Sequence, residues 1–146
     1  MVERGQGGHI VNVASMAAYV PSKQMAAYNT AKAGVLMLSE CLRAELADSG
    51  IGVSAICPGV IQTPITTTTR FGGRDAAEQQ RLRETATRVF AARGYPAERV
   101  AEAILRAVLR DRAVVPVAPE AHALRLLARL SPGALRRLAR SDVLPA

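Results

Sequence analysis

The sequence predicts an α/β fold built on a parallel β-sheet, and three observations support this prediction. Residues 9–14 (HIVNVA) and 51–57 (IGVSAIC) are short apolar runs rich in β-branched residues, as in buried parallel strands. Residues 23–47, between them, carry apolar residues three or four positions apart, which indicates one long helix. Strand, helix and strand form a βαβ unit, because two parallel strands need a crossover connection.

The elements after this unit follow in chain order. Residues 63–73 (TPITTTTRFGG) are polar, contain Pro and Gly, and predict a mobile loop, and residues 75–92 predict a helix. Pro96 favours the start of a further helix. The apolar face expected for that helix consists of Ala97, Val100, Ala101, Ile104, Leu105 and Val108.

The C-terminal part begins with residues 113–117 (AVVPV), which predict a last short strand. Pro116 favours a position at the sheet edge, because proline has no N–H for a strand ladder. From Glu120 the chain is rich in Leu and Arg, and residues 131–133 (SPG) divide it into two short helices.

Composition limits the class of protein. With 146 residues, 49% of them hydrophobic, the chain is long and apolar enough for one domain with a core. The net charge of +7 raises the question of a nucleic acid partner. Aromatic residues make up only 3% of the chain and the arginines alternate with acidic residues, so the sequence argues against nucleic acid. An anionic cofactor accounts for part of the charge equally well.

Targeting and metal signals are weak. No run of about 18 apolar residues and no apolar signal-peptide region occurs, so we expect a soluble, cytoplasmic protein. Cys41 and Cys57 lack the spacing of metal ligands or redox pairs, so we expect no metal site and two small buried hydrophobic side chains.

Three residues predict the chemistry. Tyr28 and Lys32 are four positions apart near the start of the long helix, so their side chains share one face. A phenol is a weak acid at neutral pH, and a neighbouring ammonium favours its phenolate form. Ser15 follows the first strand, at the end where open parallel sheets bind ligands. By itself, however, a Tyr–Lys pair is far more typical of an ordinary helix surface, with a solvated Lys beside a half-buried Tyr.

Three linked motifs change that balance. GGHIVNVAS ends at Ser15, YNTAK begins thirteen positions later at Tyr28, and ICPGVIQT follows the next strand. In order, spacing and predicted structure they resemble the short-chain dehydrogenase/reductase family. The resemblance is specific from about residue 7 to residue 63 and general beyond it. It implies the C-terminal half of a Rossmann-like fold, without the N-terminal Gly-rich βαβ units.

The resemblance implies a role for each matching residue. Tyr28 is the general acid/base, Lys32 favours its phenolate and holds the nicotinamide ribose, and Ser15 positions the substrate oxygen. Pro58 and Gly59 shape the turn beside the nicotinamide. Ile61 and Thr63 match the contacts of the family to the carboxamide of NAD or NADP. The substrate is then a small alcohol or carbonyl compound.

The same resemblance divides the chain into sections. Residues 9–63 are the catalytic βαβ core, 64–92 the substrate loop and helix, 93–118 a helix and the last strand, and 119–146 the C-terminal helices. The substrate loop is expected to be a lid or a plain surface loop. We expect the C-terminal leucines to dock on the domain, or the segment to touch membranes.

The sequence also lacks features of a complete member. A complete member carries a strand and a Gly-rich turn that holds the cofactor pyrophosphate, and residues 5–8 (GQGG) precede a strand instead. We therefore expect a truncated oxidoreductase with little activity alone, whose intact parent is a homo-oligomer. The alternative is a non-catalytic interaction module that pairs with a full-length relative through the long helix.

Overall fold

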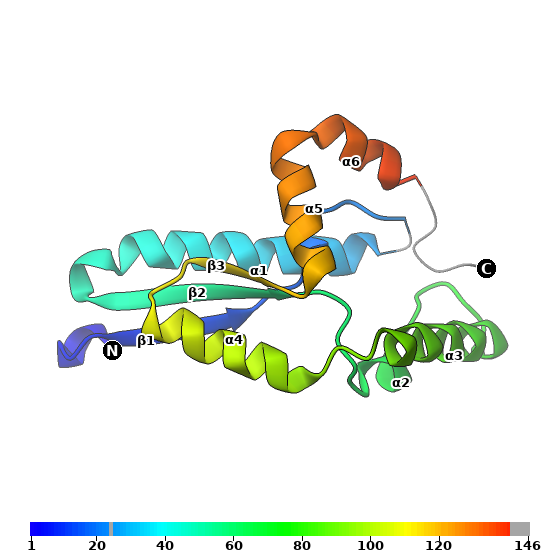
Figure 1. The fold of residues 1–146 in the computed structure, drawn as a ribbon, viewed down its shortest axis with the longest axis horizontal. Coiled ribbons are helices and arrows are strands. Elements are labelled where there is room, and N and C mark those ends of the chain that lie inside the picture. The colour runs from blue at the N-terminus through cyan, green and yellow to red at the C-terminus, as the bar shows by residue number, and fades with distance from the viewer. Residues whose placement is uncertain (24, 141–146) are drawn as a thin grey trace.

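The computed structural model of the chain describes residues 1–23 and 25–140, and it has an α/β fold around one parallel sheet. The three strands are β1 (Gly8–Val13), β2 (Ile51–Pro58) and β3 (Val114–Val117), in the spatial order β1-β2-β3. Helix α1 (Ala26–Glu45) lies along one side of these strands and α4 (Ala97–Leu109) along the other (Figure 1). The predicted α/β class with a parallel sheet is therefore confirmed.

The βαβ unit is the centre of the fold. β1 and β2 pair in parallel, with Gly8 beside Ile51 and Val13 beside Ile56. α1 connects them, and Gly50, with φ of 64°, ends the short 3-10 helix Ala47–Ser49 that follows it. β2 is the central strand, and this explains its nearly continuous apolar sequence, since both of its faces are covered.

The remaining elements are mostly helical. Asp75 caps a long helix by accepting a hydrogen bond of 2.8 Å from the backbone N–H of Glu78. The loop predicted at 63–73 contains a short helix. Residues 141–146, the end of the predicted C-terminal segment, lie outside the described residues. The other elements are the 3-10 helices Val2–Arg4 and Met16–Ala18, α2 (Ile65–Thr68), α3 (Ala76–Arg93), α5 (Pro119–Leu130) and α6 (Pro132–Leu138).

The face that α4 turns to the core differs from the predicted one. The buried core cluster contains Ala103 and Ala107, with Val100 and Ile104 packed against it. Leu105, predicted to be buried, is 65% exposed. Two helical stripes overlap on this sequence, and the stripe with the alanines faces the sheet because small side chains let helix and strands approach closely.

The two cysteines differ in burial. Cys57 at the end of β2 is fully buried, as predicted. Cys41 is exposed on α1, so the prediction of a second buried thiol was wrong. Within residues 1–23 and 25–140, no helix is long and apolar enough to cross a membrane.

The two edges of the sheet are finished differently. At the β3 edge Pro116 has no N–H to donate, and Nη1 of Arg125 donates to the carbonyl oxygen of Val114 at 3.2 Å. β3 thus occupies an edge, as predicted. In the described part of the chain β1 pairs only with β2, so its outer edge is open.

A polar cluster joins the strands at their amino-terminal end. Nε2 of His9 lies 2.8 Å from Oγ of Ser54, which donates to the carbonyl oxygen of Arg112 at 2.5 Å. Arg43 donates to both carboxylate oxygens of Asp111, at 2.8 Å and 2.6 Å. The hydrogen bond from Arg43 holds the pKa of Asp111 below its usual range. The cluster thereby ties the turn before β3 to α1 and β1.

Candidate active site

The candidate site lies at the carboxyl edge of the sheet. Val13 pairs with Ile56, and the N–H of Ala14 donates to the carbonyl oxygen of Ile56 at 2.7 Å. β1 and β2 run parallel, so the residues after Val13 and the end of β2 at Pro58 meet at the same edge. This edge is where open α/β sheets bind ligands.

Ser15 stands directly after β1 and is held in place. It is buried, and its Oγ accepts a hydrogen bond of 3.1 Å from the backbone N–H of Ala17. This bond caps the 3-10 helix Met16–Ala18. Because the oxygen acts as an acceptor, the hydroxyl proton can still be donated to a ligand.

Tyr28 and Lys32 lie on one face in the first turns of α1, as the spacing predicts. Nζ of Lys32 is 5.8 Å from the centre of the Tyr28 ring, within range of a cation–π contact. The Tyr28 side chain is 39% exposed and can therefore be reached by a ligand.

Lys32 also connects α1 to the end of β1. Its Nζ donates a hydrogen bond of 3.1 Å to the carbonyl oxygen of Val13, two residues before Ser15. Lys32 thus connects Tyr28 to the end of the strand that leads to Ser15.

Asn29 is a site neighbour that the sequence analysis missed. It is buried, and its Nδ2 donates to the carbonyl oxygen of Val20 at 2.6 Å and to Oγ of Ser22 at 2.9 Å. These bonds fix the loop after the 3-10 helix against α1, directly beside Tyr28. Its Oδ1 is buried without a hydrogen-bond partner among the described residues. The sequence could have indicated Asn29 only by its position directly after Tyr28.

Tyr19 is a second phenol near Ser15, but its surroundings differ. Burial raises the pKa of Tyr19 far above its usual range, and burial also raises the pKa of the neighbouring Cys57 thiol. Both groups therefore stay protonated at neutral pH. Of the two tyrosines, Tyr28 is the one with an exposed ring and an ammonium beside it.

The turn after β2 leaves the sheet at the same carboxyl edge as Ser15. The N–H of Gly59 donates to the carbonyl oxygen of Val117 at 2.9 Å, which ties the turn to β3. Ile61 is buried, and Pro58 and Thr63 are half-buried. Of the four predicted residues, Pro58 ends β2, and Gly59, Ile61 and Thr63 lie in the segment that follows it.

Glu120, at the start of α5, holds this turn from behind. Its Oε1 accepts a hydrogen bond of 2.8 Å from the N–H of Val60, and its Oε2 pairs with Arg93 at the end of α3. A Cβ on Gly59 would collide with the Glu120 carboxylate, so any other residue there would require the Glu120 side chain to shift. Burial alone would raise the pKa of Glu120, but the bonds from Arg93 and Val60 outweigh it, and the pKa is lowered.

The segment between this turn and α3 is fixed by side-chain bonds. Oγ1 of Thr66 lies 2.8 Å from Oγ1 of Thr87, and Nε of Arg83 donates to the carbonyl oxygen of Thr69 at 2.8 Å. α2 therefore packs on α3. Among residues 1–23 and 25–140, no group of three or more His, Cys, Asp or Glu side chains could hold a metal ion.

Known proteins resemble the chain in sequence. Residues 1–72 match the family model described as short chain dehydrogenase. The "Probable oxidoreductase EphD" of Mycobacterium tuberculosis is 49% identical over 146 residues, which cover 99% of this chain and 25% of the relative. The 1-deoxy-11-beta-hydroxypentalenate dehydrogenase of Streptomyces exfoliatus is 38% identical over 80 residues, 53% of this chain and 29% of that protein. The chain thus spans about a quarter of the length of these curated relatives.

Solved structures share the fold. A short chain dehydrogenase/reductase from Burkholderia phymatum in complex with NAD superposes with a TM-score of 0.74 and 25% identity, over 100% of this chain and 54% of that one. A short-chain dehydrogenase from Sphingobium yanoikuyae in complex with NADPH has a TM-score of 0.61 and 26% identity, over 99% and 50%. The chain therefore matches about half of each structure, and its predicted likeness to part of a Rossmann-like fold is confirmed.

Proposed function

Because this chain belongs to the short-chain dehydrogenase family, we propose that it is the catalytic part of an NAD(P)-dependent oxidoreductase that interconverts an alcohol and a carbonyl compound. The observation that carries this proposal is the position of Lys32, which lies beside the Tyr28 ring and is bonded to the end of β1. That arrangement puts a phenol and an ammonium at the ligand-binding edge of the sheet.

The proposed roles follow from the contacts. Tyr28 donates a proton to the carbonyl oxygen in reduction and removes one from the alcohol in oxidation. Lys32 favours the phenolate through its charge, and its hydrogen bond to Val13 keeps it in place. Ser15 donates its hydroxyl proton to the substrate oxygen, since its Oγ accepts from Ala17.

The cofactor would lie against the turn after β2. Pro58 and Gly59 would face the nicotinamide, Ile61 and Thr63 would hold its carboxamide, and Lys32 with Tyr28 would hold the ribose. The turn fits such a ligand because Glu120 and Val117 fix its backbone from behind. When bound, the nicotinamide supplies or accepts the hydride. The similar structures bind NAD in one case and NADPH in the other, so the proposed cofactor is NAD or NADP.

We further propose that the chain has little or no activity alone and works as part of a longer protein. It spans a quarter of its curated relatives, and the outer edge of β1 is open in the described residues. Further strands on that edge would carry the Gly-rich turn for the pyrophosphate. The longer protein is proposed to act on a small alcohol or carbonyl compound and to be a homo-oligomer, with α2 and α3 beside the substrate.

The activity is tested in the longer reading frame that contains this chain. With NAD or NADP and a panel of secondary alcohols, the Tyr28→Phe variant should lose turnover by at least about 100-fold. Its affinity for the cofactor should fall much less, because Lys32 still holds the ribose. Retained turnover in this variant would remove Tyr28 from its role.

The dependence on further strands is tested with residues 1–146 alone. A calorimetric titration with NAD, and another with NADP, should give no binding at micromolar concentrations. Micromolar binding by residues 1–146 would contradict the proposed need for a longer chain without affecting the role of Tyr28.

A second candidate function is that of a non-catalytic interaction module, and one observation is compatible with both functions. α1 carries five small, exposed residues, and small residues permit close packing of a second helix. These are Ala26, Ala27, Ala31, Ala33 and Gly34. Under this alternative, residues 1–146 form a stable complex with a full-length relative, and Ala33→Arg abolishes it. Size-exclusion chromatography tests for the complex. The Tyr28→Phe substitution is then made in residues 1–146, and the activity of the full-length relative is measured in the complex. The interaction module is favoured if the complex forms and this activity does not change.

A further inference from the structure

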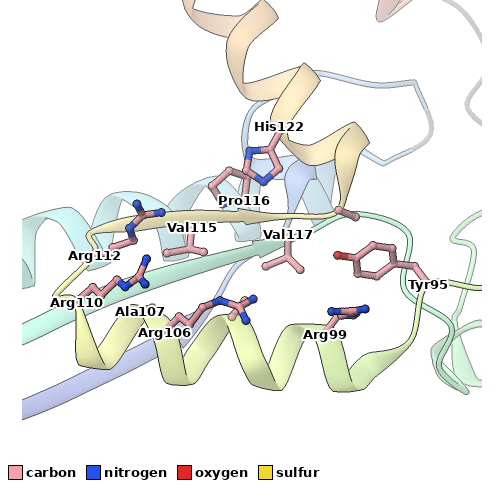
Figure 2. Close-up of a pocket in the computed structure, with 12 residues that line it drawn as sticks. Tyr95, Arg99, Arg106, Ala107, Arg110, Arg112, Val115, Pro116, Val117 and His122 are labelled. Atoms are coloured by element: carbon pink, nitrogen blue, oxygen red, sulfur yellow. The ribbon is translucent and has the colours of Figure 1, made fainter.

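A cationic cavity lies between α4 and β3, and it shares only Val117 with the residues described above as supporting the turn after β2. Its volume is about 210 Å³. Figure 2 shows Arg110 and Arg112 at one end and Tyr95 with Arg99 at the other, while His122 of α5 approaches from above β3. Arg106 lies between the two ends (Figure 2). The proposed oxidoreductase function makes no use of this cavity.

The positive charge of the cavity is only partly balanced. Glu102 contacts Arg99 at 3.4 Å and Arg106 at 3.5 Å, which are long for ion pairs. In the described part of the chain, no hydrogen bond or ion pair involves the guanidinium groups of Arg110 and Arg112. Four guanidinium groups therefore share one carboxylate.

The floor of the cavity is apolar and belongs to the core. Ala103, Ala107 and Val117 belong to the buried core, and Val115 packs against them. An apolar group placed on this floor would leave water, while the arginines at the rim remain free to bind an anion. The cavity thus suits a ligand with one apolar and one anionic part.

The geometry favours a small molecule over a peptide strand. An extended peptide would have to pair with the outer edge of β3, where Pro116 has no N–H and Arg125 already occupies the carbonyl oxygen of Val114. The volume is also below the roughly 300–1,000 Å³ of pockets for drug-sized ligands, so the ligand is compact.

We propose that this cavity binds a compact organic phosphate. The phosphate oxygens would be held by Arg106, Arg110 and Arg112, because guanidinium groups match phosphate geometry with paired N–H donors. The apolar part of the ligand would lie on Ala107 and Val117.

The test uses residues 1–146 with phenyl phosphate and inorganic phosphate as probes, followed by NMR. Both anions should shift the amide signals of the cavity residues. Phenyl phosphate should bind about tenfold more tightly than inorganic phosphate, because its ring covers the apolar floor. The double variant Arg106→Gln/Arg110→Gln should weaken phenyl phosphate binding by about tenfold or more.

The matched control removes the same charge elsewhere. Arg136 and Arg137 lie exposed on α6 and do not line the cavity. Arg136→Gln/Arg137→Gln should leave the affinity within about twofold, by the same measure. The proposal is overturned if neither anion binds, or if the control variant loses as much affinity as the cavity variant. All four arginines are exposed, so both variants should fold.

Discussion

Nζ of Lys32 lies 5.8 Å from the centre of the Tyr28 ring and at the same time donates to the carbonyl oxygen of Val13 at 3.1 Å. The ammonium is therefore held between the helix that carries the phenol and the strand that leads to Ser15. One side chain fixes the distance between the two elements that supply the proposed catalytic groups.

Replacing Lys32 should affect both stability and activity. Lys32→Met removes the hydrogen bond to Val13 and should lower the free energy of unfolding by about 1 kcal/mol, measured by urea denaturation. In the longer protein it should lower turnover by at least about 100-fold. Tyr28→Phe is the control, because it keeps the ring and should leave the stability of residues 1–146 nearly unchanged. Equal stability of Lys32→Met and the parent chain would mean that the Val13 bond contributes nothing.

Gly59 and Glu120 should be energetically coupled. Gly59→Ala places a Cβ against the Glu120 carboxylate and should break its bond to the N–H of Val60, at a cost of about 1–3 kcal/mol. In a Glu120→Ala background the carboxylate is gone, so the same substitution should cost much less. The measurement is a double-mutant cycle from urea denaturation. Additive effects would contradict the contact.

Acid should weaken the contact of Glu120 with the turn. The pKa of this carboxyl is lowered in the folded state, so its stabilising contribution is fully present above the unfolded value of about 4.3 and is lost as the pH falls through the folded pKa. Glu120→Gln, which cannot ionise, should flatten the stability curve below about pH 4.3. Thermal melts of both proteins between neutral and acidic pH test this prediction. If stability falls with pH as steeply in Glu120→Gln as in the parent chain, the prediction is wrong.

Ser54 should fix the protonation of His9. Its hydroxyl has one proton, which it donates to the carbonyl oxygen of Arg112, so it can only accept from Nε2 of His9. Nitrogen NMR of the histidines should find Nε2 of His9 protonated. Ser54→Ala should cost about 1–3 kcal/mol by leaving buried polar groups unpaired. A protonated Nδ1 together with a bare Nε2 would contradict the network.

The two thiols should react differently. Cys41 is exposed and should be labelled at once by a thiol reagent in the folded chain. Cys57 is fully buried and its pKa is raised by burial, so it should react only after denaturation. The Cys41→Ser variant should lose the fast phase of labelling. If both thiols of the parent chain were labelled fast, Cys57 at the end of β2 would be accessible, and the prediction would be wrong.

Local sequence patterns predicted the βαβ unit well. The predicted strands at 9–14 and 51–57 correspond to β1 and β2, because runs of β-branched residues need only local information. The face of α4 was predicted wrongly for Leu105, since two apolar stripes overlap and only the sheet decides between them. α2 was missed because a single turn of threonines has no helical periodicity.

The sequence predicted some residues of the candidate site and missed others. Ser15, Tyr28 and Lys32 were predicted from three linked motifs whose order and spacing resemble the short-chain dehydrogenase/reductase family, because the spacing of Tyr28 and Lys32 alone is common on helix surfaces. The support of the turn by Glu120 was not predicted, since its carboxylate reaches Val60 across sixty positions of the chain. Its partner Arg93 comes from a third element, and no local pattern connects the three.

The two edges of the sheet differ in how readily a further strand can pair with them. At β3, Pro116 and the arginine bonded to Val114 restrict pairing, whereas in the described part of the chain β1 presents an open row of backbone groups. A strand that joins this sheet, whether from a longer chain or from another molecule, should therefore pair more readily beside β1 than beside β3. A proline or a charged side chain introduced on β1 would hinder such an addition more than the same change at β3.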